Sequence, residues 1–231
     1  MSRRQLLRDA GAAALATVLA QLPGMLGPDQ LLEAASASSS DLTTDTLNAL
    51  LAFLVPGADD YSTQQGQSTA QPGGVASNAV QSLIYDLDRS VPASVFASAG
   101  VTVPASSGVA AMLNSYALQV NPLAIGPFPS RFARLSFAEK AEVFRRIERD
   151  LEPSNSELAF VGGILQGFAT FLVFSEAGVL DPQRRQLTAQ PVGWALTHYA
   201  GPSAGWPEFR GYYHGRRRVK GAGPNATRSP K

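Results

Sequence analysis

The chain has 231 residues, of which 45% are hydrophobic and 16% are charged, a balance that favours one globular domain plus extensions over disorder or two full domains. Its net charge of +1 provides no overall field for nucleic acid, and we expect no nucleic-acid partner. Cysteine is absent, which excludes disulfides, thiolate metal sites, a cysteine nucleophile and c-type haem.

The N-terminal segment has the order of a signal peptide. Paired arginines precede an uncharged, alanine-rich stretch over 11–22, and small residues two apart follow at 35–37. The uncharged stretch is short for a membrane span, which needs about twenty apolar residues. We expect residues 1–37 to be a twin-arginine (Tat) signal peptide; the alternative is an amphipathic N-terminal helix. The residues expected to carry the export signal are Arg3, Arg4, Leu6 and Leu7.

Apolar residues then recur at helical spacing in three segments, at 47–54, 80–87 and 109–116. The polar, glycine-containing segment between the first two, 56–74, is expected to be a flexible loop. Asp59 and Asp60 lie in this segment, and adjacent loop carboxylates are usually solvated turn residues. A metal-binding or acid–base pair is the alternative for these two aspartates.

The fourth predicted helix covers 136–151. Ser136 and Glu139 form a capping box, in which each side chain satisfies a backbone donor at the start of the helix. Charged residues from Lys140 to Arg149 are interpreted as a solvated face, supported by pairs such as Glu142 with Arg146.

The fifth predicted helix covers 160–175 and carries no charge, which indicates a helix buried on every side. Its Gly163 and Gly167 form a spacing that lets another backbone approach closely, and a membrane span is the alternative for this segment. Strand signals are scarce. The predicted fold class is therefore all-α: an irregular helical bundle around a buried central helix (about 160–175), with long loops and an extended aromatic C-terminal segment.

The C-terminal segment concentrates aromatic residues among glycines and prolines, and helical amphipathicity does not explain them. They are expected to lie against a partner, since tyrosine, tryptophan and arginine are enriched at interface hot spots, or against the domain's own helices. The helical domain is expected to cover 38–215, and a basic, disordered tail 216–231. The aromatic residues predicted to form the interface are Trp194, Tyr199, Trp206, Tyr212 and Tyr213.

Motifs for dinucleotides, phosphates and serine hydrolases are absent from the sequence, and we predict no catalytic, cofactor-binding or metal-binding residue. Glu176 is the carboxylate expected to be partly buried, at the end of an uncharged helix near Gly178. The two histidines, His198 and His214, lack a second ligand at helical spacing. A stand-alone exported enzyme that uses Glu176, His198 or His214 is the alternative function.

Several of these segments together resemble a known family, the small subunit (subunit 3) of gluconate 2-dehydrogenase-type complexes. The resemblance covers the Tat-like leader, "LSFAEKAEVFRRIE", "FATFLVFSEAGVLDP" and "AGWPEFRGYY". The residues that occupy the family's motif positions are Leu135, Ser136, Glu139, Gly178, Asp181, Pro182, Trp206, Gly211 and Tyr212.

The resemblance implies a helical subunit without its own cofactor that binds a flavin-dependent oxidoreductase of the glucose-methanol-choline type. FAD is expected in that partner, and the small subunit supplies the Tat signal by which both cross the cytoplasmic membrane. The resemblance adds Gly211 to the residues of the predicted interface, which already include Trp206 and Tyr212. The Tat translocase is the second expected partner, and membrane contact is expected only through the leader; the other alternative is a membrane-associated structural protein.

Overall fold

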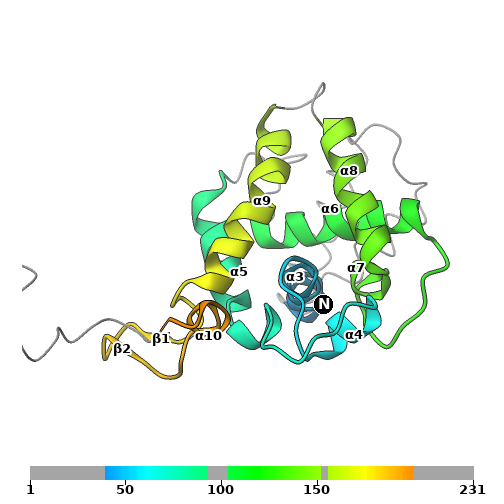
Figure 1. Ribbon diagram of the computed structural model, residues 1–231. Helices are drawn as coiled ribbons and strands as arrows, with labels where there is room; N and C mark the ends of the chain where they lie inside the picture. Colours follow the sequence, from blue (N-terminus) through cyan, green and yellow to red (C-terminus); the bar gives the residue numbers. More distant parts are fainter. Residues whose placement is uncertain (1–39, 93–103, 152–155, 200–231) are drawn as a thin grey trace, which may run out of the picture.

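The computed structural model describes residues 40–92, 104–151 and 156–199 (Figure 1). These ranges form an all-α bundle with one short two-stranded sheet, which confirms the predicted fold class. The predicted signal peptide, the basic tail and the interface residues beyond Tyr199 lie outside the described residues.

The described helices include the five that the sequence predicts, here α3, α5, α6, α8 and α9. In chain order the elements are α3 (Ser40–Leu54), α4 (Asp60–Gln64), the 3-10 helix η1 (Val75–Ser77), α5 (Val80–Ser90), α6 (Ala105–Val120), α7 (Arg131–Arg134), α8 (Phe137–Leu151), α9 (Ser156–Phe174), β1 (Leu180–Asp181), β2 (Gln186–Leu187) and α10 (Val192–Thr197).

The helix at the centre of the bundle is α3, and not the uncharged helix 160–175. Figure 1 shows α3 nearly end-on, with α5 and α9 on one side and α4, α7 and α8 on the other. Its leucines Leu47, Leu50 and Leu51 are buried, and so are the polar residues Asp45 and Thr46. The prediction of a central helix at 160–175 is therefore wrong, because lack of charge does not distinguish a helix buried all round from one with an exposed apolar face.

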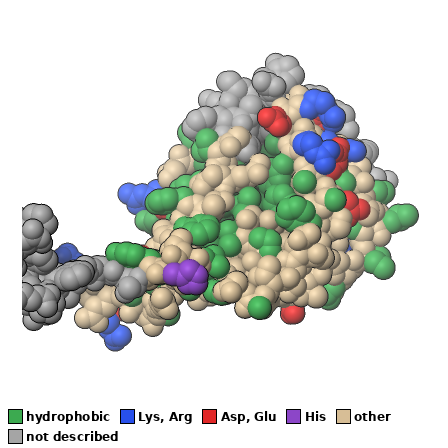
Figure 2. All heavy atoms as spheres, viewed as in Figure 1, with side chains coloured by type: hydrophobic (Ala, Val, Ile, Leu, Met, Phe, Trp, Pro, Cys, Tyr) green, Lys and Arg blue, Asp and Glu red, His purple; other side chains and the backbone are tan. Residues whose placement is uncertain are grey.

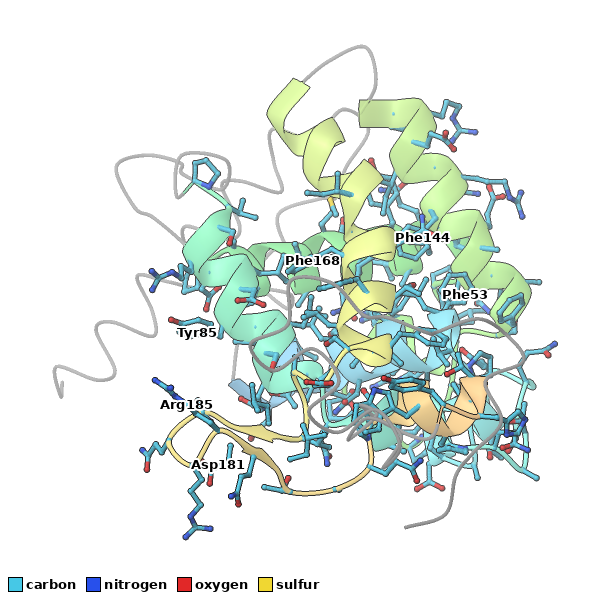
Figure 3. The ribbon with its side chains drawn as sticks, turned by 60° about the vertical axis from the view of Figure 1, so that its left-hand side comes forward. Phe53, Tyr85, Phe144, Phe168, Asp181 and Arg185 are labelled. Atoms are coloured by element: carbon cyan, nitrogen blue, oxygen red, sulfur yellow. The ribbon has the colours of Figure 1, made fainter. Side chains whose placement is uncertain are left out.

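Aromatic rings join α3 to α8 and α7. Phe53 of α3 stacks on Phe144 of α8 with ring centroids 5.6 Å apart, and Phe132 of α7 meets Phe144 edge to face at 6.2 Å (Figure 3). Offset and edge-to-face pairs are favoured by the ring quadrupole in addition to the area they bury. These rings pack α3, α7 and α8 against one another, next to the buried Lys140.

The N-terminus of α8 has the predicted capping box. The Ser136 N–H and hydroxyl both donate to Glu139 Oε2 at 2.8 Å, and the Glu139 N–H donates to Ser136 Oγ at 3.4 Å. Burial raises the pKa of Glu139, but the hydrogen bonds from Ser136 and Asn121 outweigh it and lower this pKa overall. The predicted ion pair within α8 is also present, with Arg146 Nε 3.0 Å from Glu142 Oε1.

The segment 56–74 contains an ordered helix that the sequence analysis missed. Asp59 caps α4 by accepting from the Ser62 N–H at 2.8 Å and from the Ser62 hydroxyl at 2.9 Å. The backbones of Gly57 and Gly73 cross so closely that a Cβ on Gly57 would lie 2.4 Å from the Gly73 nitrogen. Asp59 is thus a half-buried helix cap, whereas Asp60 is exposed as predicted.

The C-terminal part of the described chain begins with a hairpin and ends with α10. A Cβ on Gly178 would lie 1.9 Å from the Ser77 carbonyl oxygen, and a Cβ on Gly193 would lie 2.3 Å from the Phe174 carbonyl oxygen. These glycines let the hairpin pack on the start of α5 and α10 on the end of α9. The aromatic segment therefore starts as a helix at 192–197, where an extended chain was predicted.

Candidate functional site

The structure brings together the two predicted interface residues that it describes. Trp194 and Tyr199 meet edge to face with ring centroids 5.2 Å apart, and the Tyr199 N–H donates to the Trp194 carbonyl at 2.9 Å. Between them His198 ends α10 in the left-handed conformation, with φ of 54°. Trp194 is half-buried and Tyr199 exposed, so the pair forms part of the surface next to α9.

One side of α9 is exposed, and we call it the α9 face. Its members recur at helical spacing: Gly163, Ile164, Gly167, Phe171 and Phe174 are all exposed, and Phe171 retains 66% of its surface. No charged residue occurs from 163 to 175. Burial of such rings away from water is favourable, and contiguous exposed apolar surface is typical of a binding site.

The glycine pair on α9 does not receive another backbone in the described structure. A Cβ built on Gly163 or Gly167 meets no atom within 4 Å. The predicted close backbone approach at these glycines is therefore absent from the described contacts, because the pair lies on the α9 face. Figure 2 shows charged side chains gathered over α8, whereas hydrophobic and uncharged side chains cover much of the remaining surface in this view.

A second candidate site is a buried polar cluster between α3, α6 and α7, which the sequence analysis did not find. Asn114 Nδ2 donates to Thr46 Oγ1 at 2.8 Å, and Ser130 Oγ donates to Asn114 Oδ1 at 2.9 Å. Asp45 accepts from the Tyr61 hydroxyl at 2.7 Å and from the Ser130 N–H at 2.8 Å. Each buried polar group named here thus has a partner, which is what a stable interior requires.

Lys140 extends this polar region toward α4, and its burial corrects the prediction of a solvated face. The side chain is 0% exposed, its Nζ donates to Gln65 Oε1 at 2.8 Å, and Nζ lies 5.5 Å from the centroid of the Phe132 ring. Burial lowers the pKa of Lys140 to about 7, although the charges of Asp59 and Asp45 oppose this shift. Lys140 therefore exchanges its proton near neutral pH.

Gln65 connects Lys140 to two further elements. Its side-chain Nε2 donates to the Ala52 carbonyl of α3 at 2.8 Å, and its main-chain carbonyl accepts from the Phe137 N–H at 3.0 Å. Gln65 therefore links α3, α4 and the start of α8. A neutral lysine amine is nucleophilic, but the Lys140 amine has no exposed surface through which a substrate could reach it. The geometry supports a structural and pH-dependent role for Lys140.

The other groups considered for catalysis lie on the surface. Glu176, expected to be partly buried, is exposed in the turn after α9, and His198 is exposed at the end of α10. Glu176 was placed at the end of α9, but the helix ends at Phe174 and the side chain extends into solvent. His214 lies outside the described residues. Within 40–92, 104–151 and 156–199, no group of three or more His, Asp or Glu side chains could hold a metal ion.

Comparisons with known proteins give no relative for this chain: no family model, no curated protein and no solved structure matches it. Among the described helices, none combines the length and the apolar character needed to cross a membrane. Function is therefore inferred from the α9 face, from the Trp194–Tyr199 pair beside it and from the residues of the sequence.

The burial of Lys140 could have been predicted from the sequence, but the exposed side of α9 could not. Position 140 is three, four and seven residues before the buried Val143, Phe144 and Ile147, so helical spacing places it on the inner side of α8. The charge of lysine led to the opposite assignment. For α9 the apolar residues occur around the whole helix, and the spacing alone gave no reason to choose an exposed side.

Proposed function

We propose that this chain is a non-catalytic accessory subunit, exported by the Tat pathway, that binds and co-exports a flavin-dependent oxidoreductase of the glucose-methanol-choline type. In this proposal FAD belongs to the partner, and the small subunit contributes the export signal and a binding surface. The working location of the complex is then the periplasm or the cell surface.

The observation that carries the proposal is the α9 face. It presents Phe171 and Phe174 on a helix whose opposite side, with Leu172 and Val173, is buried. The helix α10 brings Trp194 and Tyr199 next to the C-terminal end of α9. Apolar side chains of this size are stabilised by burial against another protein. Two of the predicted interface residues, Trp194 and Tyr199, thus adjoin an exposed apolar surface, which supports a function in binding.

The N-terminal sequence supports the export part of this proposal. Arg3 and Arg4 precede a short uncharged stretch, as in a signal read by the Tat receptor. The motifs at Ser136 and Glu139, and at Gly178 and Asp181, support the family resemblance on which the identity of the partner depends.

The test is a mild pull-down of the tagged full-length chain from its own host, with mass spectrometry and a flavin absorbance spectrum of the eluate. We expect a stoichiometric flavoprotein that lacks its own signal sequence. Phe171→Ser should reduce its recovery, because it replaces the most exposed ring of the α9 face with a small polar group. Tyr85→Ser is the matched control, since Tyr85 is 60% exposed on α5. A colourless monomer from the wild-type chain would contradict the proposal.

Export is tested separately with Arg3→Lys/Arg4→Lys in the same host. We expect both this chain and the flavoprotein to remain in the cytoplasm, because the paired arginines are the element that the receptor reads. If the flavoprotein is still exported in this variant, the small subunit does not carry it.

A further inference from the structure

Lys140 is a buried amine with one hydrogen-bond acceptor among the described residues. Its side chain is 0% exposed, and that acceptor is Gln65 Oε1, 2.8 Å from Nζ. An ammonium group carries three donors, so the charged form leaves two donors without an acceptor in the interior, which is costly. The Phe132 ring, 5.5 Å from Nζ, offsets part of this cost through its quadrupole. The closed structure therefore disfavours the charged form.

The carboxylates whose charges act on Lys140 are occupied by other donors. Both oxygens of Asp45 on α3 accept hydrogen bonds, and so do both oxygens of Asp59 at the start of α4. Within the ranges that the structure describes, no ion pair joins Lys140 to either carboxylate. The two aspartates therefore attract a proton to Lys140 from a distance but do not replace its missing acceptors.

The other ionisable groups on the elements around Lys140 have partners or exposure of their own. On α7, Arg134 donates to two loop carbonyls and Arg131 is half-exposed. On α8, Glu139 belongs to the capping box. Burial, followed by the hydrogen bond to Asp45, raises the pKa of the Tyr61 hydroxyl of α4, so it keeps its proton at neutral pH. Lys140 is thus the group here whose charge changes near neutrality.

The partner of Lys140 belongs to a weakly packed segment. Gln65 ends α4, a helix of five residues, and residues 66–71 after it are all exposed. A helix of this length is not stable alone, and a segment with few buried apolar contacts opens at a low free energy. Lys140 itself lies on α8, whose inner side is part of the core. Separation of the two side chains therefore moves α4 and leaves α8 in place.

Opening of this segment gives the ammonium group the acceptors that it lacks. Water then reaches Nζ and pairs with its protons, so the open arrangement binds a proton more tightly than the closed one. Proton uptake must therefore shift the equilibrium toward opening. Burial lowers the pKa of Lys140 to about 7 in the closed structure, which places this shift between neutral and alkaline pH.

We propose that Lys140 and Gln65 form a proton-dependent latch that holds α4 against α8, and that uptake of a proton by the amine favours release of the segment 56–74. The latch involves neither the export signal nor the α9 face, so it does not depend on the proposed function. Figure 1 shows α4 beside α7 at the edge of the bundle, where it can move without separating the longer helices.

Release of α4 also reaches the loop 121–130, which rests on this helix. Gln64 Nε2 donates to the Ile125 carbonyl at 3.3 Å, and the Tyr61 ring stacks on Phe128 with centroids 4.3 Å apart. Both contacts are made by side chains of α4, so they are lost when the latch opens. The latch therefore changes the shape of the surface at this end of the bundle as the pH changes.

The test is hydrogen–deuterium exchange of the full chain, read by mass spectrometry at pH 6, 7, 8 and 9, for the wild type and Lys140→Met. Methionine has no proton to gain, so opening of this variant should not depend on pH. Intrinsic exchange is the same in both proteins at one pH, and the ratio of their rates therefore measures opening. For peptides from 57–74 we expect this ratio to rise by up to about tenfold per unit as the pH falls from 9 to 7, and to level off below 7.

Peptides from α6 in the same samples show whether the opening is local. The inner residues of α6 are buried, so these peptides should be much better protected than 57–74. Equal protection of the two regions overturns the latch, because the segment would then open only with the whole bundle. A ratio for 57–74 that does not change with pH also overturns it. The wild type alone, corrected for intrinsic exchange, gives the same test if Lys140→Met does not fold. Arg145→Met, which removes an exposed charge from the same helix, is the matched control and should behave as the wild type.

Discussion

Two sides of the bundle differ in the kind of side chain that they bury and the kind that they expose. Around α4 and the start of α8, the polar side chains of Asp45, Gln65 and Lys140 are buried and hydrogen-bonded. Along α9, the apolar rings of Phe171 and Phe174 are exposed. In this chain, the polarity of a side chain therefore does not by itself decide whether the side chain is buried or exposed. The comparison also separates a side that stabilises the fold from a side that is available for binding.

The largest expected difference between the two sides is in stability. Phe132→Ala removes a ring that is completely buried against Phe144 and Lys140, and should lower the free energy of unfolding by about 3–5 kcal/mol. Phe171→Ala removes a ring of equal size from the α9 face and should change it by no more than about 0.5 kcal/mol. Urea unfolding of both variants measures the contrast. A similar loss in both would mean that the α9 face is covered in the free chain.

The second prediction uses the pH dependence of stability. The pKa of Lys140 is about 7 in the folded chain and has its ordinary value of 10.5 in the unfolded chain. Between these values the unfolded chain binds more protons, so stability should rise with pH, by up to about 1.4 kcal/mol per pH unit. Below pH 7 both states hold the proton and this contribution is constant.

The contribution of Lys140 to the pH dependence of stability is best measured between pH 7 and 10. Above this range, ionisation of the buried tyrosines lowers the stability of the folded chain. Burial raises the pKa of Tyr116 to about 12, and burial together with Asp45 raises the pKa of Tyr61, so their ionisation favours the unfolded chain at high pH. Urea midpoints at pH 7, 8 and 9 measure the slope, and Lys140→Met should abolish it. A wild-type chain with no slope, or a variant that keeps it, would show that Lys140 does not titrate as described.

The third prediction concerns the cap of α8. Ser136→Ala removes the side-chain acceptor for the Glu139 N–H and one donor to Glu139, and should lower the free energy of unfolding by about 1 kcal/mol. Ser136→Asp, which retains an acceptor at the cap, should recover part of this loss. If Ser136→Ala is as stable as the wild type, the cap contributes less than its geometry indicates.

The sequence was sufficient for the elements that local rules specify. Hydrophobic spacing located α3, α5 and α6, the pair Ser136 and Glu139 located the start of α8, and an uncharged run located α9. The helix α4 was missed because it has five residues and no apolar repeat, and a capping aspartate and contacts with distant glycines hold it in place.

The candidate site was less predictable, because exposure depends on the tertiary arrangement. Trp194 and Tyr199 were singled out from their composition, and the structure places them together. The exposed side of α9, and the exposed Leu123 and Ile125 between α6 and α7, have no local signal, since a leucine in a loop is equally compatible with burial. Only the positions of the neighbouring helices decide between the two.

The last prediction concerns the two glycines of the α9 face, whose replacement should have opposite effects on the stability of the free chain and on its binding to a partner. Gly163 and Gly167 lie inside a helix with open space at their Cβ positions, and glycine in a helix interior is less favourable than alanine by about 0.5–1 kcal/mol. Gly163→Ala and Gly167→Ala should therefore each stabilise the free chain by up to this amount.

If a partner packs against the α9 face at these glycines, the same variants should weaken the complex, because added methyl groups would separate the two surfaces. Gly193→Ala is the control, since its Cβ would collide with the Phe174 backbone and destabilise the free chain. Thermal unfolding of the free variants and their affinity for the proposed flavoprotein partner measure the two effects. Alanines that stabilise the chain without weakening the complex would exclude this part of α9 from the proposed interface.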